Sequence, residues 1–321
     1  MRSVTCSSVP SSWTADPPNL SSGPPSVTTG RVRKAIFPAA GLGTRFLPVT
    51  KAQPKEMLPL VDKPTIQYGV EEAIASGIEE VIMVTGGGKR AIVDHFDRSL
   101  ELEHYLRLRG RDDLLEILKQ VDVLSDRVRI VYTQQKEPLG LGHAVWTASK
   151  LVEGEACAVL LADDVILGAA EPCLKQLIDA HQQTGATVLA VRRFPRSEVG
   201  RYGVVVTDGS NGRLHNVTAM VEKPKPGTEP SDLAILGRYV LAPAVFNELE
   251  RGTPGAGSEI QLTDAIMRTV GTHPVVGLEF EGDYYDTGTV PGYLRANLTL
   301  AMRREGLREE LTPLLRELLG E

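Results

Sequence analysis

Long apolar runs and clustered cysteines are both absent from the sequence. No run of about 18 apolar residues occurs, so no membrane-spanning helix is predicted. The three cysteines, Cys6, Cys157 and Cys173, lack the spacing of metal ligands, and Cys157 lies inside an apolar run as a buried thiol would. We therefore expect a reduced, cytoplasmic setting.

An excess of basic residues is also absent. The chain has 35 Lys and Arg against 41 Asp and Glu, a net charge of −6 at pH 7, and no basic cluster. Binding to a nucleic-acid backbone needs concentrated cations, so nucleic acid is excluded as the main partner. Small anionic ligands are not excluded, because a local basic site can exist in an acidic protein.

Composition changes along the chain predict three regions. Residues 1–33 begin with a segment rich in Ser, Pro, Thr and Gly that has no apolar core of a signal peptide, so we expect a disordered N-terminal extension. Residues 34–290 should form a catalytic domain, and residues 291–321 a C-terminal helical segment. Four leucines there (Leu311, Leu314, Leu315 and Leu318) form an apolar face, which either the chain's own core or another subunit should cover.

Short apolar runs alternate with helical patterns in the first half of the chain. Strands are predicted at Lys34–Ala40, Val81–Val84, Val128–Tyr132, Ala156–Ala162 and Ala186–Val191. Helices are predicted from Pro64 at position N1 to Gly77, from Lys89 to about Gln120 with a break near Gly110, and at Gly142–Leu151 and Leu174–Gln183. This alternation favours parallel crossovers, in which ligands bind beyond the carboxyl ends of the strands.

The second half has a different pattern. A hairpin is predicted from Tyr202–Thr207 and Leu214–Val221, followed by strands at Ala234–Leu241 and Val275–Glu281, a helix at Glu259–Val270 and helices after Pro291. The predicted fold is α/β and Rossmann-like, with a mixed, mainly parallel sheet flanked by helices, a β-hairpin insertion and C-terminal helices.

A glycine loop, Ala39–Arg45, follows the first predicted strand. Its end lacks the Gly-Lys-Ser/Thr of a Walker loop, and Phe46 stands where a dinucleotide-binding loop has a small residue. The loop is followed by the cations Lys51 and Lys55, and with Arg45 these could bind a triphosphate. The alternative is a tight turn with solvated cations.

Several longer motifs resemble one known family. They are AAGLGTRFLPVTKAQPKEMLPLVDKP at Ala39–Pro64, LADD at Leu161–Asp164, VEKP at Val221–Pro224, EIQLTDAI at Glu259–Ile266 and DTGTVPGY at Asp286–Tyr293. Together they look like the signature of sugar-nucleotide pyrophosphorylases, which have a GT-A-like fold. The resemblance extends from Lys34 to about residue 305. It is strongest to the bacterial branch that transfers uridylyl to glucose 1-phosphate.

The resemblance implies roles on the nucleotide side. The residues that would face UTP are Ala40, Gly41, Leu42, Gly43, Gln135, Gly140 and Gly142, with Gln135 reading the uracil edge. Arg45 and Lys55 would hold the triphosphate and stabilise the departing pyrophosphate. Many relatives have Lys at the position of Leu139, and Gly86–Gly88 has one glycine more than expected.

It also implies roles on the sugar side. Asp163 and Asp286 would ligate Mg²⁺, which prefers oxygen ligands. Glu222 would bind the sugar hydroxyls, Lys223 the sugar phosphate, and Gly203 and Gly237 would line the sugar site. The catalytic residues would be Arg45, Lys55 and Lys223.

Some assignments stay open at this stage. Asp163 and Asp164 are adjacent, so either could be the ligand, and the pair could instead cap a helix. His143 is interpreted as structural, because an ionised sugar phosphate needs no general base. A relative that uses dTTP, or a catalytically silent sugar-nucleotide sensor, remains the alternative. We also expect a homodimer or homotetramer.

Overall fold

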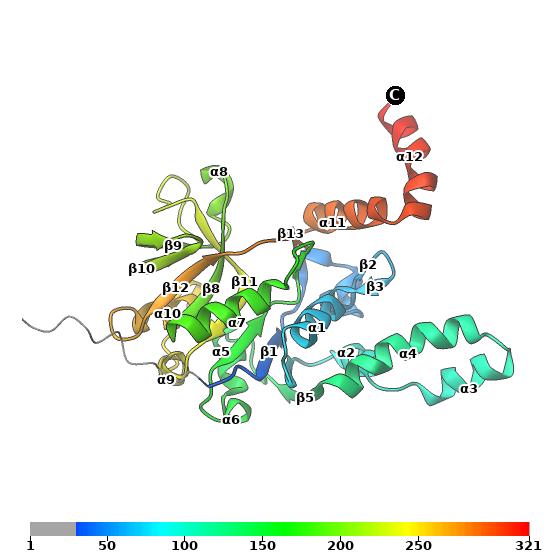
Figure 1. Ribbon diagram of the computed structural model, residues 1–321, viewed down its shortest axis with the longest axis horizontal. Coiled ribbons are helices and arrows are strands. Elements are labelled where there is room, and N and C mark those ends of the chain that lie inside the picture. Colours follow the sequence, from blue (N-terminus) through cyan, green and yellow to red (C-terminus); the bar gives the residue numbers. More distant parts are fainter. Residues whose placement is uncertain (1–29, 321) are drawn as a thin grey trace, which may run out of the picture.

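The computed structural model describes residues 30–320, which are built around one nine-stranded sheet (Figure 1). Its strand order is β5-β4-β1-β6-β11-β8-β12-β10-β9. The strands are β1 Lys34–Ala39, β4 Glu80–Thr85, β5 Arg129–Gln134, β6 Cys157–Leu160, β8 Thr187–Arg193, β9 Gly203–Asn211, β10 Leu214–Glu222, β11 Leu233–Leu241 and β12 Val275–Glu279. Each overlaps a predicted strand, and the α/β fold with a mixed sheet is confirmed.

One half of the sheet is parallel, whereas the other half is mixed. Strands β5, β4, β1 and β6 are parallel neighbours, so their carboxyl ends meet at one edge. Strand β11 runs antiparallel to both β6 and β8, and β9 and β10 form the predicted hairpin, while β8 and β12 are parallel. The loops after β1, β5 and β6 are therefore brought together at the same edge.

Helices cover both faces of this sheet. Alternate strand residues face opposite layers, so Phe37 belongs to one core and Ile36 to the other. Helices α1 Thr65–Ala75, α2 Arg90–Phe96 and α7 Cys173–Thr184 pack on the Phe37 side. Helices α5 Leu141–Thr147, α6 Ser149–Val152, α9 Pro243–Glu250 and α10 Leu262–Thr269 pack on the Ile36 side.

Two small sheets were not predicted. One pairs β7 Asp164–Leu167 with β13 Asp283–Asp286, so that Asp164 lies opposite Asp286. The other pairs β2 Pro59–Leu60 with β3 Lys63–Pro64. Each strand has at most four residues and carries no distinct alternation, so only the pairing partner defines it.

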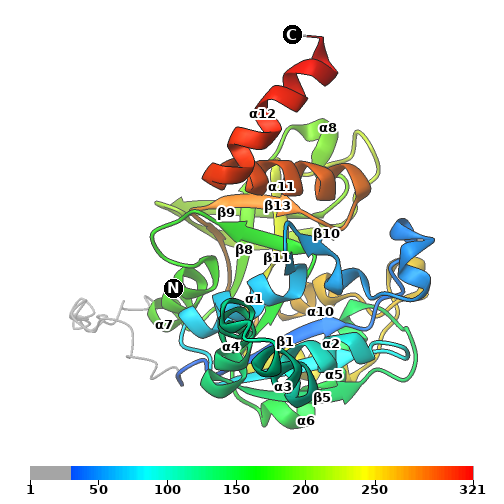
Figure 2. The ribbon, with the colours of Figure 1, turned by 90° about the vertical axis from the view of Figure 1, so that its right-hand side faces the viewer.

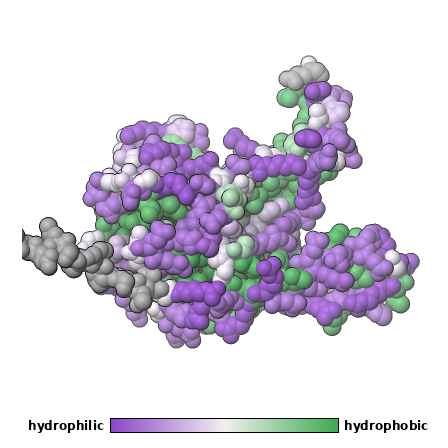
Figure 3. Space-filling model, in the orientation of Figure 1, coloured by the Kyte–Doolittle hydropathy of each residue, from purple (hydrophilic) through white to green (hydrophobic). Residues whose placement is uncertain are grey.

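Several predicted helix boundaries are wrong. Pro64 is extended and precedes α1 as its N-cap rather than occupying N1. The helix expected from Lys89 to Gln120 is three helices: α2, α3 Leu100–Leu108 and α4 Asp112–Arg127. Asp97 is extended and ends α2. Helices α3 and α4 form an arm that projects from the body, and apolar residues lie on its surface (Figures 1 and 3). Leu108 and Ile117 are two of the exposed apolar side chains of this arm.

The two ends of the described chain pack differently. Val32 is buried, and Arg33 O accepts hydrogen bonds from Glu79 N and Glu80 N, so the folded chain starts before Lys34. The rest of the predicted N-terminal extension, residues 1–29, lies outside the described residues. At the other end, α11 Val290–Arg303 packs on the body, whereas α12 Glu305–Leu319 projects away and buries none of its residues (Figure 2).

Candidate active site

A cavity of about 560 Å³ opens at the carboxyl ends of β1, β5 and β6. The predicted site residues that line it are Ala40, Gly41, Leu42, Gly43, Lys55, Gln135, Gly140, Asp163 and Lys223. The predicted residues Arg45, Gly142, Gly203, Glu222, Gly237 and Asp286 do not line it directly. Each of these six is adjacent to a lining segment in the sequence or in space.

Lys55 and Asp163 form the central ion pair of the cavity. Lys55 Nζ lies 2.5 Å from Asp163 Oδ2, and both side chains are about one quarter exposed. Burial raises the pKa of Asp163, but the charge and hydrogen bond of Lys55, together with a backbone hydrogen bond and the charge of Arg45, hold that pKa below its ordinary value. Asp163 is therefore an anion that faces the cavity together with a cation.

Asp286 brings a second carboxylate to Asp163. A Cβ placed on Gly288 would lie 2.9 Å from Asp163 Oδ2 and 3.3 Å from Asp286 Oδ1, so both oxygens flank the same point. Thr287 N and Thr287 Oγ1 donate to Asp163 O at 2.8 and 2.7 Å, which fixes the two loops to each other. The pair offers oxygen ligands from two segments of the chain.

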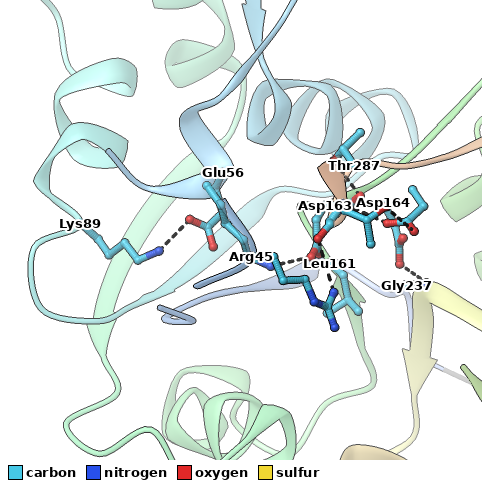
Figure 4. Close-up of polar contacts among 12 residues, drawn as sticks. Arg45, Glu56, Lys89, Leu161, Asp163, Asp164, Gly237 and Thr287 are labelled. Carbon is cyan, nitrogen blue, oxygen red and sulfur yellow. Dashed lines mark hydrogen bonds and ion pairs between the residues drawn. The ribbon is translucent and has the colours of Figure 1, made fainter. Parts of the chain in front are cut away.

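Asp164 points away from the cavity. Its Oδ2 accepts from Gly237 N at 2.9 Å (Figure 4). Its Oδ1 accepts from Tyr284 Oη at 2.6 Å. Burial, together with the charge of Asp163, raises the pKa of Asp164 to about 7. A side chain at Gly237 would collide with Asp164 Oδ2, so glycine is required there for close packing. The geometry favours Asp163 over Asp164 as the ligand.

Arg45 extends along the loop that follows Asp286. Its Nη1 lies 3.4 Å from Gly288 O, and the side chain is otherwise exposed (Figure 4). Phe46 packs edge-on against Tyr293 of α11, with ring centroids 5.7 Å apart. The guanidinium is thus placed beside the Asp163 and Asp286 carboxylates and keeps donors for a ligand.

Gln135 is held at the cavity wall by two contacts. Its Nε2 donates to Gly140 O at 3.1 Å and lies 2.9 Å from His143 Nδ1. Gly140 O can only accept, so the nitrogen of the amide faces it, and His143 Nδ1 must accept as well. His143 therefore carries its ring proton on Nε2 and orients Gln135, in agreement with a structural role.

Gly140 and Gly142 pack tightly against the segment before α10. A Cβ on Gly140 would lie 2.7 Å from Glu259 Cβ, and one on Gly142 would lie 2.7 Å from Ile260 O. Gly142 N also donates to Ile260 O at 2.8 Å. Residues 140–142 thus pack directly on residues 259–261. This close packing requires glycine at positions 140 and 142 even without a ligand.

Glu222 and Lys223 lie where β10 ends. Lys223 has a φ of 44°, so the chain turns there and its Nζ lies 3.3 Å from Glu222 Oε1. Glu222 Oε2 accepts from Thr263 Oγ1 at 2.7 Å and adjoins Gly203 across the β9–β10 pair. Because the chain turns at Lys223, these two adjacent side chains can reach one ligand.

Glu56 is a site residue that the sequence analysis missed. It lines the cavity, is 1% exposed, and pairs with Lys89 Nζ at 2.8 Å through Oε2 (Figure 4). Its Oε1 is buried and has no hydrogen-bond partner among residues 30–320. The sequence did contain a signal for Glu56, because it is an acidic residue directly after Lys55 in a motif whose other charged residues up to that point are cations.

Among residues 30–320, no helix is both long and apolar enough to cross a membrane. Among the same residues, no group of three or more His, Cys, Asp or Glu side chains is arranged to hold a metal ion. A metal at Asp163 and Asp286 would therefore need further ligands from substrate or water.

Comparison with known proteins gives consistent matches. Residues 34–303 match the family described as Nucleotidyl transferase. A UTP–glucose-1-phosphate uridylyltransferase of Bacillus subtilis is 51% identical over 291 residues, which is 91% of this chain and 98% of that protein. One of Staphylococcus haemolyticus is 49% identical over 90% of this chain and 99% of that protein.

A solved structure agrees with these sequence matches. The UTP-bound enzyme of Acinetobacter baumannii, named UGPase, superposes with a TM-score of 0.81 at 38% identity and covers 89% of this chain and 99% of that one.

Proposed function

This chain belongs to the nucleotidyl transferase family, and we propose that it transfers the uridylyl group of UTP to glucose 1-phosphate, forming UDP-glucose and releasing pyrophosphate. The observation that carries the proposal is that Lys55, Asp163, Lys223 and Gln135 line one cavity. It combines cations for phosphates, a carboxylate for a metal, and an amide for a base. The names of the relatives support the choice of uridylyl and glucose.

The reaction joins two anions. A phosphate oxygen of glucose 1-phosphate attacks the α-phosphorus of UTP, and the bond from that phosphorus to the bridging oxygen of the β-phosphate breaks. The electron pair leaves with pyrophosphate, so negative charge grows on the leaving group. We assign Lys55 and Arg45 to that charge and Lys223 to the attacking phosphate. No proton transfer is required, so His143 needs no catalytic role.

Asp163 and Asp286 fit a divalent cation, and we propose Mg²⁺. Their oxygens flank one point beside Gly288, and carboxylates with phosphate oxygens and waters match its preferred oxygen coordination. When bound, Mg²⁺ would neutralise phosphate charge and align the phosphates. Asp163 and Asp286 would contribute the anionic ligands, and the charge of Lys55 favours the ionised form of Asp163 when no metal is bound.

The nucleoside would lie between the glycine loop and Gln135. Gln135 offers an amide to the uracil edge, with Ala40–Gly43 and Gly140 close to the base and ribose. Glu56 Oε1 is a buried acceptor in the same wall, and a hydroxyl donor of the nucleotide would satisfy it. We propose no contact between Gly142 and the base, because Gly142 packs against the backbone of Ile260.

The sugar side would be formed by the end of β10. Glu222 repels phosphate and accepts hydrogen bonds, so we assign it to sugar hydroxyls, and Lys223 to the phosphate. Gly203 adjoins Glu222, whereas Gly237 supports Asp164 and contributes backbone only.

We also propose that residues 34–290 act as the catalytic domain, in the cytoplasm, within a homodimer or homotetramer. The apolar face of α12, which buries no residue in one chain, supports the association.

A pyrophosphate-release assay tests the function. UTP, dTTP, ATP and GTP are combined with glucose, galactose and mannose 1-phosphates in the presence of Mg²⁺. We expect the highest kcat/KM for UTP with glucose 1-phosphate. Higher values for dTTP would reassign the nucleotide, because a single methyl group is worth only about 1–3 kcal/mol in a pocket. Binding of UTP without any turnover would indicate a sensor instead.

A further inference from the structure

Asp164 holds two strands through its side chain although it does not line the cavity. Its oxygens accept from Gly237 N on β11 and from Tyr284 Oη on β13, at 2.9 and 2.6 Å. A buried carboxylate is costly unless it is hydrogen-bonded, and both Asp164 oxygens are. An aspartate at this position therefore joins segments that are far apart in the sequence.

The register of β7 and β13 relates Asp164 to both carboxylates of the proposed metal site. Asp164 follows Asp163 directly and lies opposite Asp286 in the strand pair. Tyr284 precedes Asp286 by two residues, so their side chains lie on the same face of β13. The Tyr284–Asp164 hydrogen bond thus sets how far β13, with Asp286, can move relative to the turn that carries Asp163.

A second set of bonds joins the same two segments. Thr287, directly after Asp286, donates to Asp163 O from both its backbone N and its Oγ1 (Figure 4). Asp163 and Asp286 are like charges beside one point and repel each other. The bonds made by Tyr284 and Thr287 oppose that repulsion.

We propose that Asp164, through Tyr284, is a positioning residue that holds the Asp163 and Asp286 carboxylates at the separation a divalent cation needs. This inference rests on the proposed function, because it takes those two carboxylates as the metal ligands. It assigns Asp164 no contact with the metal or with either substrate.

Tyr284→Phe tests the inference, because it removes only the hydroxyl that reaches Asp164. Mn²⁺ binding to the full chain is titrated by electron paramagnetic resonance without substrates. We expect the dissociation constant to rise about tenfold, the lower end of the effect of one hydrogen bond to a charged group. In the pyrophosphate assay, high Mg²⁺ should restore most of kcat, which a general loss of structure would not allow.

Tyr285→Phe is the matched control. Tyr285 is the next residue on β13, faces the opposite side, and packs in a small core with Leu60 and Val165. We expect its Mn²⁺ affinity to equal that of the unmodified chain. If Tyr284→Phe is too unstable to measure, Thr287→Val, which removes the Oγ1 bond to Asp163 O, should weaken Mn²⁺ binding in the same direction.

Three results would overturn the inference. The first is an unchanged Mn²⁺ affinity in Tyr284→Phe, and the second is equal weakening in Tyr285→Phe. The third is loss of Mn²⁺ binding in Asp164→Asn but not in Asp163→Asn, which would make Asp164 the ligand. Failure of the proposed function would instead appear as absence of turnover by the unmodified chain, while its Mn²⁺ titration still reports on the carboxylates.

Discussion

Two ion pairs contact the turn after β6, and they differ in burial. The front pair, Lys55 and Asp163, faces the cavity with about one quarter of each side chain exposed. The rear pair, Arg238 and Glu72, is 1% and 7% exposed. Arg238 also donates to Leu161 O and Gly237 O, and Glu72 Oε1 accepts from Leu174 N.

The difference separates charges that can exchange partners from charges that cannot. In front, water or substrate can replace either member of the pair, since both remain accessible. Behind, each group is surrounded by protein, and an unpaired charge would have no solvent to compensate it. We infer that the front pair serves the ligand, whereas the rear pair supports the backbone on which Asp163 stands.

The largest effect is expected from breaking the rear pair. Glu72→Gln leaves the Arg238 charge without its partner, and we expect the free energy of unfolding to fall by about 3–5 kcal/mol. Urea unfolding followed by circular dichroism measures this change. Glu71→Gln is the control, because the neighbouring Glu71 pairs with Lys63 at about one third exposure and should cost no more than about 1 kcal/mol. Similar losses in both variants would remove the distinction between buried and accessible pairs.

The front pair should show the opposite behaviour. Lys55→Met removes a cation from the developing pyrophosphate charge, and we expect kcat to fall about 10²–10³-fold while the thermal midpoint changes little. The pyrophosphate assay and thermal unfolding are measured on the same samples. Lys119→Met, which removes a cation on α4 that is 65% exposed and does not line the cavity, serves as the control and should retain near-full kcat. A large loss of stability in Lys55→Met would place the pair with the structural group instead.

The sequence predicted the front of the site better than the rear. Asp163 could be predicted because it directly follows the apolar run of β6, and the ends of parallel strands converge. The hairpin strand predicted at Leu214–Val221 likewise placed Glu222 and Lys223 at the end of β10. Local sequence therefore indicates which side chains stand at the strand ends.

The rear could not be predicted, because its contacts join residues that are distant in the chain. Glu72 and Arg238 are 166 residues apart, and Asp164 and Tyr284 are 120 apart. Neither β7 nor β13 carries a periodic pattern, so the strand pair that places Tyr284 had no local signal. The end of α2 near Asp97 could not be predicted either, because the helical pattern of residues 89–120 is interrupted only near Gly110.

A smaller effect is expected at the end of β10, where a third ion pair has one exposed member, Lys223, and one mostly buried member, Glu222. Glu222 is 15% and Lys223 60% exposed. Glu222→Gln should raise KM for glucose 1-phosphate and relax hexose preference, because charge-assisted acceptance of about 1.5–3 kcal/mol is weakened. Lys223→Ala should instead lower kcat/KM for all sugar phosphates alike, about ten- to a hundredfold. Kinetics with glucose, galactose and mannose 1-phosphates separate the two, and equal shifts in hexose preference would contradict the assignment.

The smallest effect is expected at the outer surface, where Arg304 and Asp62 link the start of α12 to the β2–β3 turn. Their two contacts are 2.5 Å long, but the side chains are 42% and 66% exposed. Asp62→Asn should therefore change the free energy of unfolding by at most about 1 kcal/mol, and by less in high salt.

The hydrogen bond from Arg304 lowers the pKa of Asp62, so the folded state binds its proton less tightly than the unfolded state. The contribution is then fully present above the unfolded pKa of about 3.9 and is lost as the pH falls through the lower folded value. Urea titrations of both proteins at pH 7 and at pH 3 should show a smaller difference at the lower pH. An undiminished difference at pH 3 would show that Asp62 acts through packing, and a difference of several kcal/mol at pH 7 would mean that exposure does not rank these pairs.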